Sequence, residues 1–172
     1  MKEILKNGSF LLSNWRDSRQ ITERIVAIYG RRRVGKTYLV DETFAGRITF
    51  RHAGLSPADE DSKGLLKLQL NHFYNSLELQ GMEKCDKPTN WLDAFLILEK
   101  FLQSRDDGSR QVVFLDELPW LDTPKSGFIR AFEAFWNTWA QEFNGYCMRK
   151  CKFMDTRQII KQSWGIVQSC YV

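Results

Sequence analysis

The sequence predicts an α/β fold in which helices alternate with the strands of a mostly parallel sheet. Two runs, 25–29 ("IVAIY") and 111–117 ("QVVFLDE"), are apolar on both faces up to their ends, as expected for strands buried on both sides. Apolar residues recur at helical spacing over 62–79, over 91–102 and from Phe128 onward. Ligands of such parallel sheets bind at the carboxyl ends of the strands.

Composition and charge narrow the class of protein. The 172 residues, 43% of them apolar and 27% charged, are typical of one soluble globular domain. The start "MKEILKNGSFLLSNWRD" has too short an apolar run for a secretion signal, and no stretch approaches the roughly 20 apolar residues of a membrane helix. We therefore expect a cytoplasmic protein without a membrane segment. The cysteines have no histidines at metal-ligand spacing and are expected to be free thiols: Cys85, Cys147, Cys151 and Cys170.

The net charge of +4 comes from residues 145–172, because residues 1–144 carry equal numbers of acidic and basic side chains. A charge run is usually a solvated face, so nucleic-acid binding is not favoured. It stays open as an alternative that rests on this basic segment and on Arg31 to Arg33.

The elements follow in order along the chain. After the strand at 25–29 we expect a short helix over 36–43, then a strand over 47–50 that ends at the turn-rich "AGLSPAD". Leucines and Phe73 predict the helix over 62–79.

The second long helix has a clear start. Asn90, with Asp93 three residues later, resembles a capping box before "WLDAFLILEKFL". The apolar stripe of this helix consists of Trp91, Phe95, Leu98 and Leu102. The turn "RDDGSR" then leads into the strand over 111–117.

An aromatic stripe follows that strand at helical spacing. Its members could pack in the core or stack on bases, and core packing is favoured because such stripes are mostly core. They are Phe128, Phe132, Phe135, Trp136, Trp139 and Phe143.

The stretch "GRRRVGKT", Gly30 to Thr37, fits the phosphate-binding pattern G-x-x-x-x-G-K-[ST] between a strand and a helix. Glycine at both ends lets the backbone amides wrap a phosphate chain, and the helix start adds its positive end. Lys36 would reach the terminal phosphates and the Thr37 hydroxyl would bind Mg²⁺. The predicted nucleotide contacts are Gly30, Arg31, Arg32, Arg33, Val34, Gly35, Lys36, Thr37 and Tyr38.

Two adjacent carboxylates, Asp116 and Glu117, end the strand at 111–117. At the tip of a buried strand they are costly unless a cation or a substrate uses them. Beside a phosphate site, Asp116 would hold Mg²⁺ and Glu117 would polarise the attacking water as the catalytic base. The sequence lacks the Asn-Lys-x-Asp of GTPases, and small-molecule kinases seldom end a strand in Asp-Glu. ATP binding and Mg²⁺-dependent ATP hydrolysis are therefore the predicted function.

Four stretches together resemble the prokaryotic AAA-related ATPases of the archaeal type, in the STAND branch of P-loop NTPases: "AIYGRRRVGKTYLV", "FRHAGLSP", "WLDAF" and "VVFLDELPWLDTPKSGF". The resemblance covers about residues 24–144. It implies the three-layer sandwich of a P-loop NTPase and the same roles for Lys36, Thr37, Asp116 and Glu117. The Gly-Arg and acid motif that the family places near the adenine has no counterpart in "NWRDSRQITER", so the adenine contacts stay unassigned.

The family continues with an apolar sensor strand and a C-terminal part, whereas residues 145–172 show no helical or strand period. Reading their codons one nucleotide later gives Trp from Met154 and Asp155, and Gly from Trp164 and Gly165. Synonymous codons then allow "DIVCGSASSWIRDKLLNKVGGLYNRVT", which resembles the absent segment. We therefore expect a partial ATPase domain over 1–144, a frameshifted or non-native tail over 145–172, and a sheet that lacks its central sensor strand.

Such a chain would be marginal and aggregation-prone, with weak nucleotide contact and impaired turnover. The alternative is a nucleotide-gated interaction module that binds ATP without significant hydrolysis. The expected partners are the nucleotide and either a protein partner or a second copy of the chain, while the cellular process and the source of any arginine from a neighbouring subunit stay open.

Overall fold

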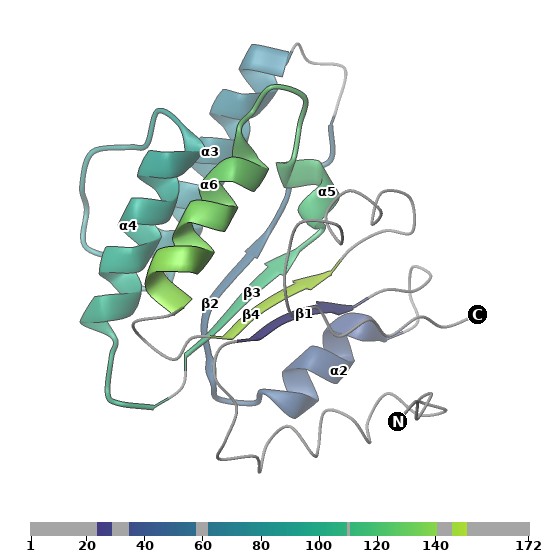
Figure 1. Cartoon of the computed structure of the whole chain (residues 1–172), viewed down its shortest axis with the longest axis vertical. Helices are drawn as coiled ribbons and strands as arrows, with labels where there is room; N and C mark the ends of the chain where they lie inside the picture. Colours follow the sequence, from purple (N-terminus) through teal and green to yellow (C-terminus); the bar gives the residue numbers. More distant parts are fainter. Residues whose placement is uncertain (1–23, 29–34, 58–61, 110, 141–145, 151–172) are drawn as a thin grey trace.

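Four parallel strands form the centre of the molecule (Figure 1). The computed structural model describes residues 24–28, 35–57, 62–109, 111–140 and 146–150. The strands are β1 (Arg24–Ile28), β2 (Ile48–Ala53), β3 (Val112–Asp116) and β4 (Tyr146–Lys150), and their order in the sheet is β1-β4-β3-β2. Every ladder is parallel, so all four carboxyl ends point to one edge of the sheet.

The helices connect these strands across the two faces of the sheet. They are α2 (Lys36–Thr43), α3 (Ser62–Leu79), α4 (Trp91–Ser104), the single turn α5 (Leu118–Leu121) and α6 (Phe128–Phe135), which continues as the π-helix η1 (Trp136–Ala140). In Figure 1, α2 lies on one side of the sheet and α3, α4 and α6 lie on the other.

The strand β3 shows how the layers meet. Val113 and Leu115 belong to the large core formed with α3, α4 and α6. The alternate residues Val112 and Phe114 pack in a second cluster with Val40 and Phe44, near α2. Because successive side chains of a strand point to opposite faces, the continuous apolar run of β3 fills both cores, as its sequence predicts.

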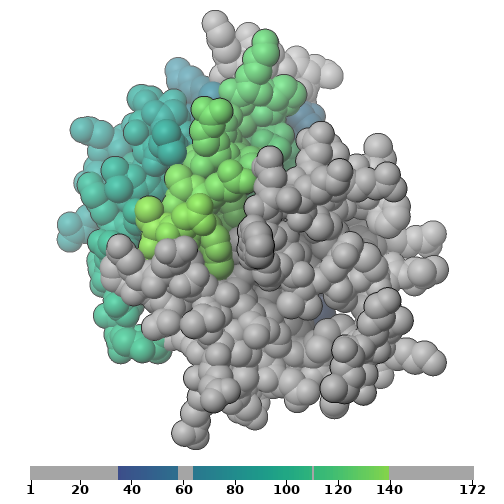
Figure 2. All heavy atoms as spheres, in the orientation of Figure 1, coloured from purple at the N-terminus to yellow at the C-terminus, as the bar shows by residue number. Residues whose placement is uncertain are grey.

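The aromatic stripe is core, which confirms the favoured interpretation for the members that the structure describes. Phe128, Phe132, Phe135 and Trp139 are each at most 3% exposed, so none offers a face to a base. Phe135 and Trp139 stack with ring centroids 5.1 Å apart. Trp136 is only partly buried, and Phe143 lies outside the described residues. In Figure 2 the atoms of α4 (teal) and α6 (green) lie side by side on the visible face of the molecule.

The start of α4 confirms the predicted cap. The Asn90 side chain accepts a hydrogen bond from the Asp93 amide at 3.0 Å. The Asp93 carboxylate reaches back to Thr89, whose amide and hydroxyl donate to it at 3.4 and 2.9 Å. The same carboxylate also accepts from the Asn90 side-chain amide at 2.7 Å, so the reciprocal bonds of this cap come from the side chain of the N-cap and from the residue before it.

The expectation of a sheet without its central strand is wrong. Tyr146–Lys150 forms β4 between β1 and β3, pairing Arg24 with Tyr146 on one side and Val112 with Tyr146 on the other. The physical reason is that a strand in this position gains backbone hydrogen bonds on both sides, and these do not depend on a side-chain period. The sheet thus continues past the domain boundary expected at residue 144. The remainder of the predicted tail, residues 151–172, lies outside the described residues.

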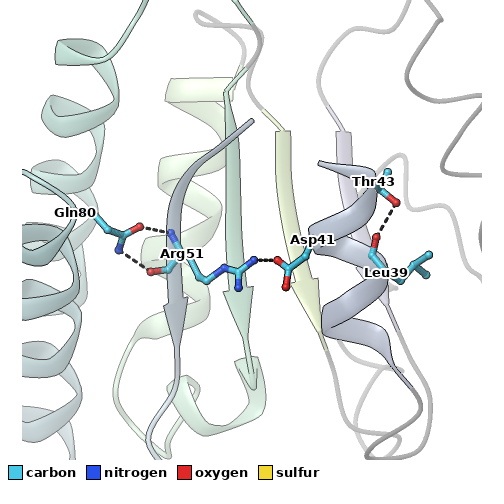
Figure 3. Close-up of polar contacts among 5 residues, drawn as sticks. All are labelled: Leu39, Asp41, Thr43, Arg51 and Gln80. Atoms are coloured by element: carbon cyan, nitrogen blue, oxygen red, sulfur yellow. Dashed lines mark hydrogen bonds and ion pairs between the residues drawn. The ribbon is translucent and has the colours of Figure 1, made fainter. Parts of the chain in front are cut away.

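The outer edge of the sheet at β2 is held by side chains (Figure 3). The Gln80 amide accepts from the Arg51 backbone N–H and donates to the Arg51 carbonyl, both at 2.8 Å, in the manner of a neighbouring strand. The Arg51 guanidinium pairs with Asp41 of α2 and lies 5.1 Å from the centre of the Phe114 ring. Arg51 therefore links the residue that follows α3 to α2, with its side chain lying over β3.

No helix in the described part of the chain combines the length and the apolar character needed to cross a membrane.

Candidate functional site at the carboxyl edge of the sheet

The first part of the candidate site is the connection from β1 to α2. β1 ends at Ile28 and α2 begins at Lys36, so the strand before and the helix after the phosphate-binding pattern are both present. Residues 29–34, and with them the predicted contacts Gly30, Arg31, Arg32, Arg33 and Val34, lie outside the described residues. Gly35 is the N-cap of α2 and has a left-handed backbone with φ 80° and ψ 16°. Most residues with a side chain disfavour this conformation, so the backbone at this position favours the second glycine of the motif.

The first turn of α2 carries the side chains predicted to meet a phosphate. Lys36 is the first helical residue and only 9% exposed, and Thr37 is half-buried. The turn contains no acidic residue, and no side chain caps the N-terminus. A lysine beside the N–H groups at the positive end of a helix is well placed to bind an anion. Tyr38 is 69% exposed.

The second part is the turn after β3. Asp116 ends the strand, and its Oδ1 accepts a hydrogen bond from the Glu117 N–H at 2.8 Å. Glu117 has φ 50° and ψ 45°, a left-handed conformation that is uncommon for a residue with a side chain. It is the N-cap of the single turn α5, and both carboxylate residues are half-buried. A non-glycine residue held in this region stores strain, which proteins concentrate at functional sites.

The sheet brings these two parts to the same edge. β1 and β3 are parallel and only β4 lies between them, so their carboxyl ends are about 10 Å apart at ordinary strand spacing. A triphosphate with a bound metal ion spans such a gap. Gly35, Lys36 and Thr37 thus lie on the β1 side of this gap, and Asp116 and Glu117 lie on its β3 side.

The turn at Glu117 rests on the backbone that follows β2. The Gly54 N–H donates to the Asp116 carbonyl at 3.0 Å, and a β-carbon on Gly54 would lie 2.9 Å from the Glu117 carbonyl oxygen. Gln69 of α3 is fully buried and binds both segments. Its amide accepts from the Leu55 N–H at 3.1 Å and donates to the carbonyls of Leu55 and Trp120 at 2.8 and 2.7 Å. Sequence reasoning missed Gly54 and Gln69, because no pattern marks a glutamine whose partners are backbone groups far along the chain.

The donor set fits Mg²⁺. A hydroxyl from Thr37 and a carboxylate from Asp116 are the hard oxygen ligands that this ion takes together with phosphate oxygens and water. Among the residues that the structure describes, no group of three or more His, Cys, Asp or Glu side chains could hold a metal ion by itself. The site accordingly suits an ion that arrives with a phosphorylated ligand.

A second polar cluster lies on the α3 side of β2. His52 is 2% exposed, and its Nδ1 lies 2.9 Å from the Ser76 hydroxyl oxygen, which in turn donates to the His72 carbonyl. The His52 and His72 ring centroids are 4.9 Å apart. Burial, with a smaller contribution from the His72 charge, lowers the pKa of His52 to about 3, so the ring is neutral near neutral pH.

No known protein family matches the chain, and no curated protein matches it at a significant level.

Proposed function

We propose that this chain binds ATP with Mg²⁺ at the carboxyl edge of the sheet and hydrolyses it, as a member of the AAA-related ATPases that its sequence resembles. One observation carries the proposal. The start of α2, with its glycine cap and buried lysine, and the two carboxylates after β3 lie at the same edge of the sheet, and only β4 separates β1 from β3. A strand–loop–helix with the pattern "GRRRVGKT" and a separate Asp-Glu strand end are needed together for phosphoryl transfer to water.

Each residue has a chemical role in this proposal. The N–H groups at the start of α2 and the Lys36 ammonium bind the phosphate oxygens. Thr37 and Asp116 hold the metal ion, which when bound neutralises charge on the phosphates. The Glu117 carboxylate accepts the proton of the attacking water. The bond from the Glu117 N–H to Asp116 Oδ1 orients the Asp116 carboxylate.

Nucleotide affinity tests the binding half of the proposal. Lys36→Ala should weaken ATP binding about 10- to 100-fold, because a charge-assisted hydrogen bond to phosphate is lost. Lys67→Ala, which removes an exposed lysine of α3, is the matched control and should leave affinity unchanged. Titration with a fluorescent ATP analogue measures both. Equal affinity in the wild type and in Lys36→Ala would refute the phosphate-loop assignment.

Turnover tests the hydrolytic half and separates it from the nucleotide-gated alternative. Glu117→Gln should keep ATP affinity and lower the hydrolysis rate about 10²- to 10⁴-fold, since the amide cannot accept the proton. Glu133→Gln, on half-buried Glu133 of α6, is the control for loss of one carboxylate. Phosphate release under single-turnover conditions measures the rate. If the wild type binds ATP but releases no phosphate, the chain is a nucleotide-gated module instead.

A further inference from the structure

Two glutamines, Gln69 of α3 and Gln80 directly after the last residue of that helix, make the same kind of contact with β2 and the chain that follows it. Gln80 binds the N–H and the carbonyl of Arg51, and its amide also donates to the Ser76 carbonyl at 2.7 Å. Gln69 binds the N–H and the carbonyl of Leu55, and its amide also donates to the Trp120 carbonyl. Each amide therefore makes three hydrogen bonds to backbone groups. Gln69 is fully buried and Gln80 is half-buried. The third bond of Gln80 returns to Ser76 of α3, whereas the third bond of Gln69 crosses to α5.

That third bond ties α3 to the turn that carries Glu117. Trp120 belongs to α5, and its N–H donates to the Glu117 carbonyl at 2.9 Å. The same carbonyl lies so close to Gly54 that no side chain fits between them. The left-handed backbone of Glu117 is thus held by two contacts. The Gly54 backbone packs against its carbonyl, and Gln69 binds the Trp120 carbonyl in the turn that follows.

We propose that Gln69 is a positioning residue for Glu117. The inference rests on the proposed function, because it gives Gln69 a role in directing the proposed catalytic base. A left-handed conformation is unfavourable for a residue with a side chain and persists only where its surroundings hold it. With the Gln69 amide removed, the Trp120 carbonyl loses a buried partner and the turn can relax toward an ordinary conformation, which swings the Glu117 carboxylate away from its place at the strand end.

Gln69→Met tests this proposal, with Gln80→Met as the matched control. Both changes replace an amide by an unbranched side chain of similar size and remove three backbone hydrogen bonds, so both should lower stability. Only Gln69→Met should slow turnover, by about 10- to 100-fold, because displacement of a reacting group by about 1 Å has effects of this size. ATP affinity should stay within about twofold in both variants, since Lys36 and the start of α2 are untouched.

Hydrogen exchange provides a readout that needs no nucleotide. Amides of residues 116–121 should exchange faster in Gln69→Met than in Gln80→Met, because only the first loosens this turn. Gly54→Ala is a second variant in which Gln69 is intact: its β-carbon presses on the Glu117 carbonyl and should reproduce the selective loss of turnover. The two effects should be less than additive when combined, because both act on one turn.

The outcomes distinguish this inference from the proposed function. Equal turnover in Gln69→Met and Gln80→Met, or equal exchange over 116–121, overturns the role of Gln69 and leaves ATP hydrolysis standing. Wild-type binding that does not depend on Lys36 defeats the proposed function, and faster exchange over 116–121 in Gln69→Met alone would still show that Gln69 holds the turn. Loss of ATP affinity in Gln69→Met but not in Gln80→Met also overturns the inference, since a positioning residue for Glu117 should change the rate and not the binding.

Discussion

At the scale of single residues, two side chains in the interior stand out because their surroundings are unusual for their chemistry. Glu117 keeps a backbone conformation that suits glycine, and His52 is a titratable ring among Phe50 and Phe73. His52 Nε2 is buried without a hydrogen-bond partner among the described residues. A buried imidazole that must take up a charge loses its favourable hydration, so its proton affinity and the stability of the fold are linked.

We predict that acid destabilises the fold through His52. Its pKa in the folded chain, about 3, lies below its ordinary value of 6.5, so the unfolded chain binds a proton that the folded chain does not. The stabilising effect of a neutral His52 is therefore full above about pH 6.5 and is lost progressively as the pH falls toward 3. Between about pH 7.5 and pH 5 the free energy of unfolding should fall by about 2 kcal/mol from this group.

Urea denaturation of the wild type and of His52→Phe at both pH values measures the effect. The difference in unfolding free energy between the two proteins should shift by that amount, because phenylalanine fits the aromatic surroundings and does not titrate. Ser76→Ala removes the hydroxyl beside the ring but leaves the ring titratable, so its pH dependence should follow the wild type. An identical pH dependence in the wild type and His52→Phe would contradict the prediction.

At the scale of elements, α4 owes its start to a defined set of side-chain bonds. Asn90→Ala should lower the free energy of unfolding by about 1 kcal/mol, because the Asp93 N–H then lacks the acceptor that caps the helix. Asn75→Ala is the control, since Asn75 is exposed within α3 and alanine favours a helix interior. Thermal or urea unfolding of the two variants makes the comparison. A loss in Asn75→Ala as large as that in Asn90→Ala would rule out the cap as the cause.

The elements that the sequence predicts well are those whose side chains carry a period or a local signal. The cap at Asn90, the helix over Ser62–Leu79 and the doubly buried β3 follow from such patterns. β4 does not follow from such a pattern, because its position depends on the unpaired edges of β1 and β3 rather than on its own side chains. The π-helix η1 likewise continues an aromatic stripe that predicts only helix.

The candidate site divides in the same way. Lys36, Thr37, Asp116 and Glu117 belong to local motifs, and the order of the strands brings those motifs to one edge. The left-handed Glu117 and the bonds of Gln69 could not be predicted, because they depend on which backbone groups α3 and β2 bring opposite each other. A sequence pattern gives the chemistry of a site more readily than the contacts that hold it.

At the scale of the whole molecule, the sheet depends on its central strand. A chain that ends at residue 144 leaves both β1 and β3 without a neighbour on their facing sides. We predict that this truncation aggregates and loses its cooperative thermal transition. A chain that ends at Lys150 retains β4 and should keep the transition. Calorimetry and size-exclusion chromatography of the two truncations provide the comparison, and equal behaviour would show that β4 is dispensable.

The position of β4 also sets the order in which the chain can fold. β1 pairs in the described sheet only with β4, and most of the chain is synthesised between the two. The pairing of β2 with β3 and the aromatic core do not require β4, so they can form before β4 joins the sheet. Until β4 joins the sheet, β1 has no neighbouring strand and β3 has one unpaired edge. The slowest step of folding is therefore the closing of the long loop between β1 and β4. A chain in which β4 has not yet joined the sheet is therefore in its most association-prone form.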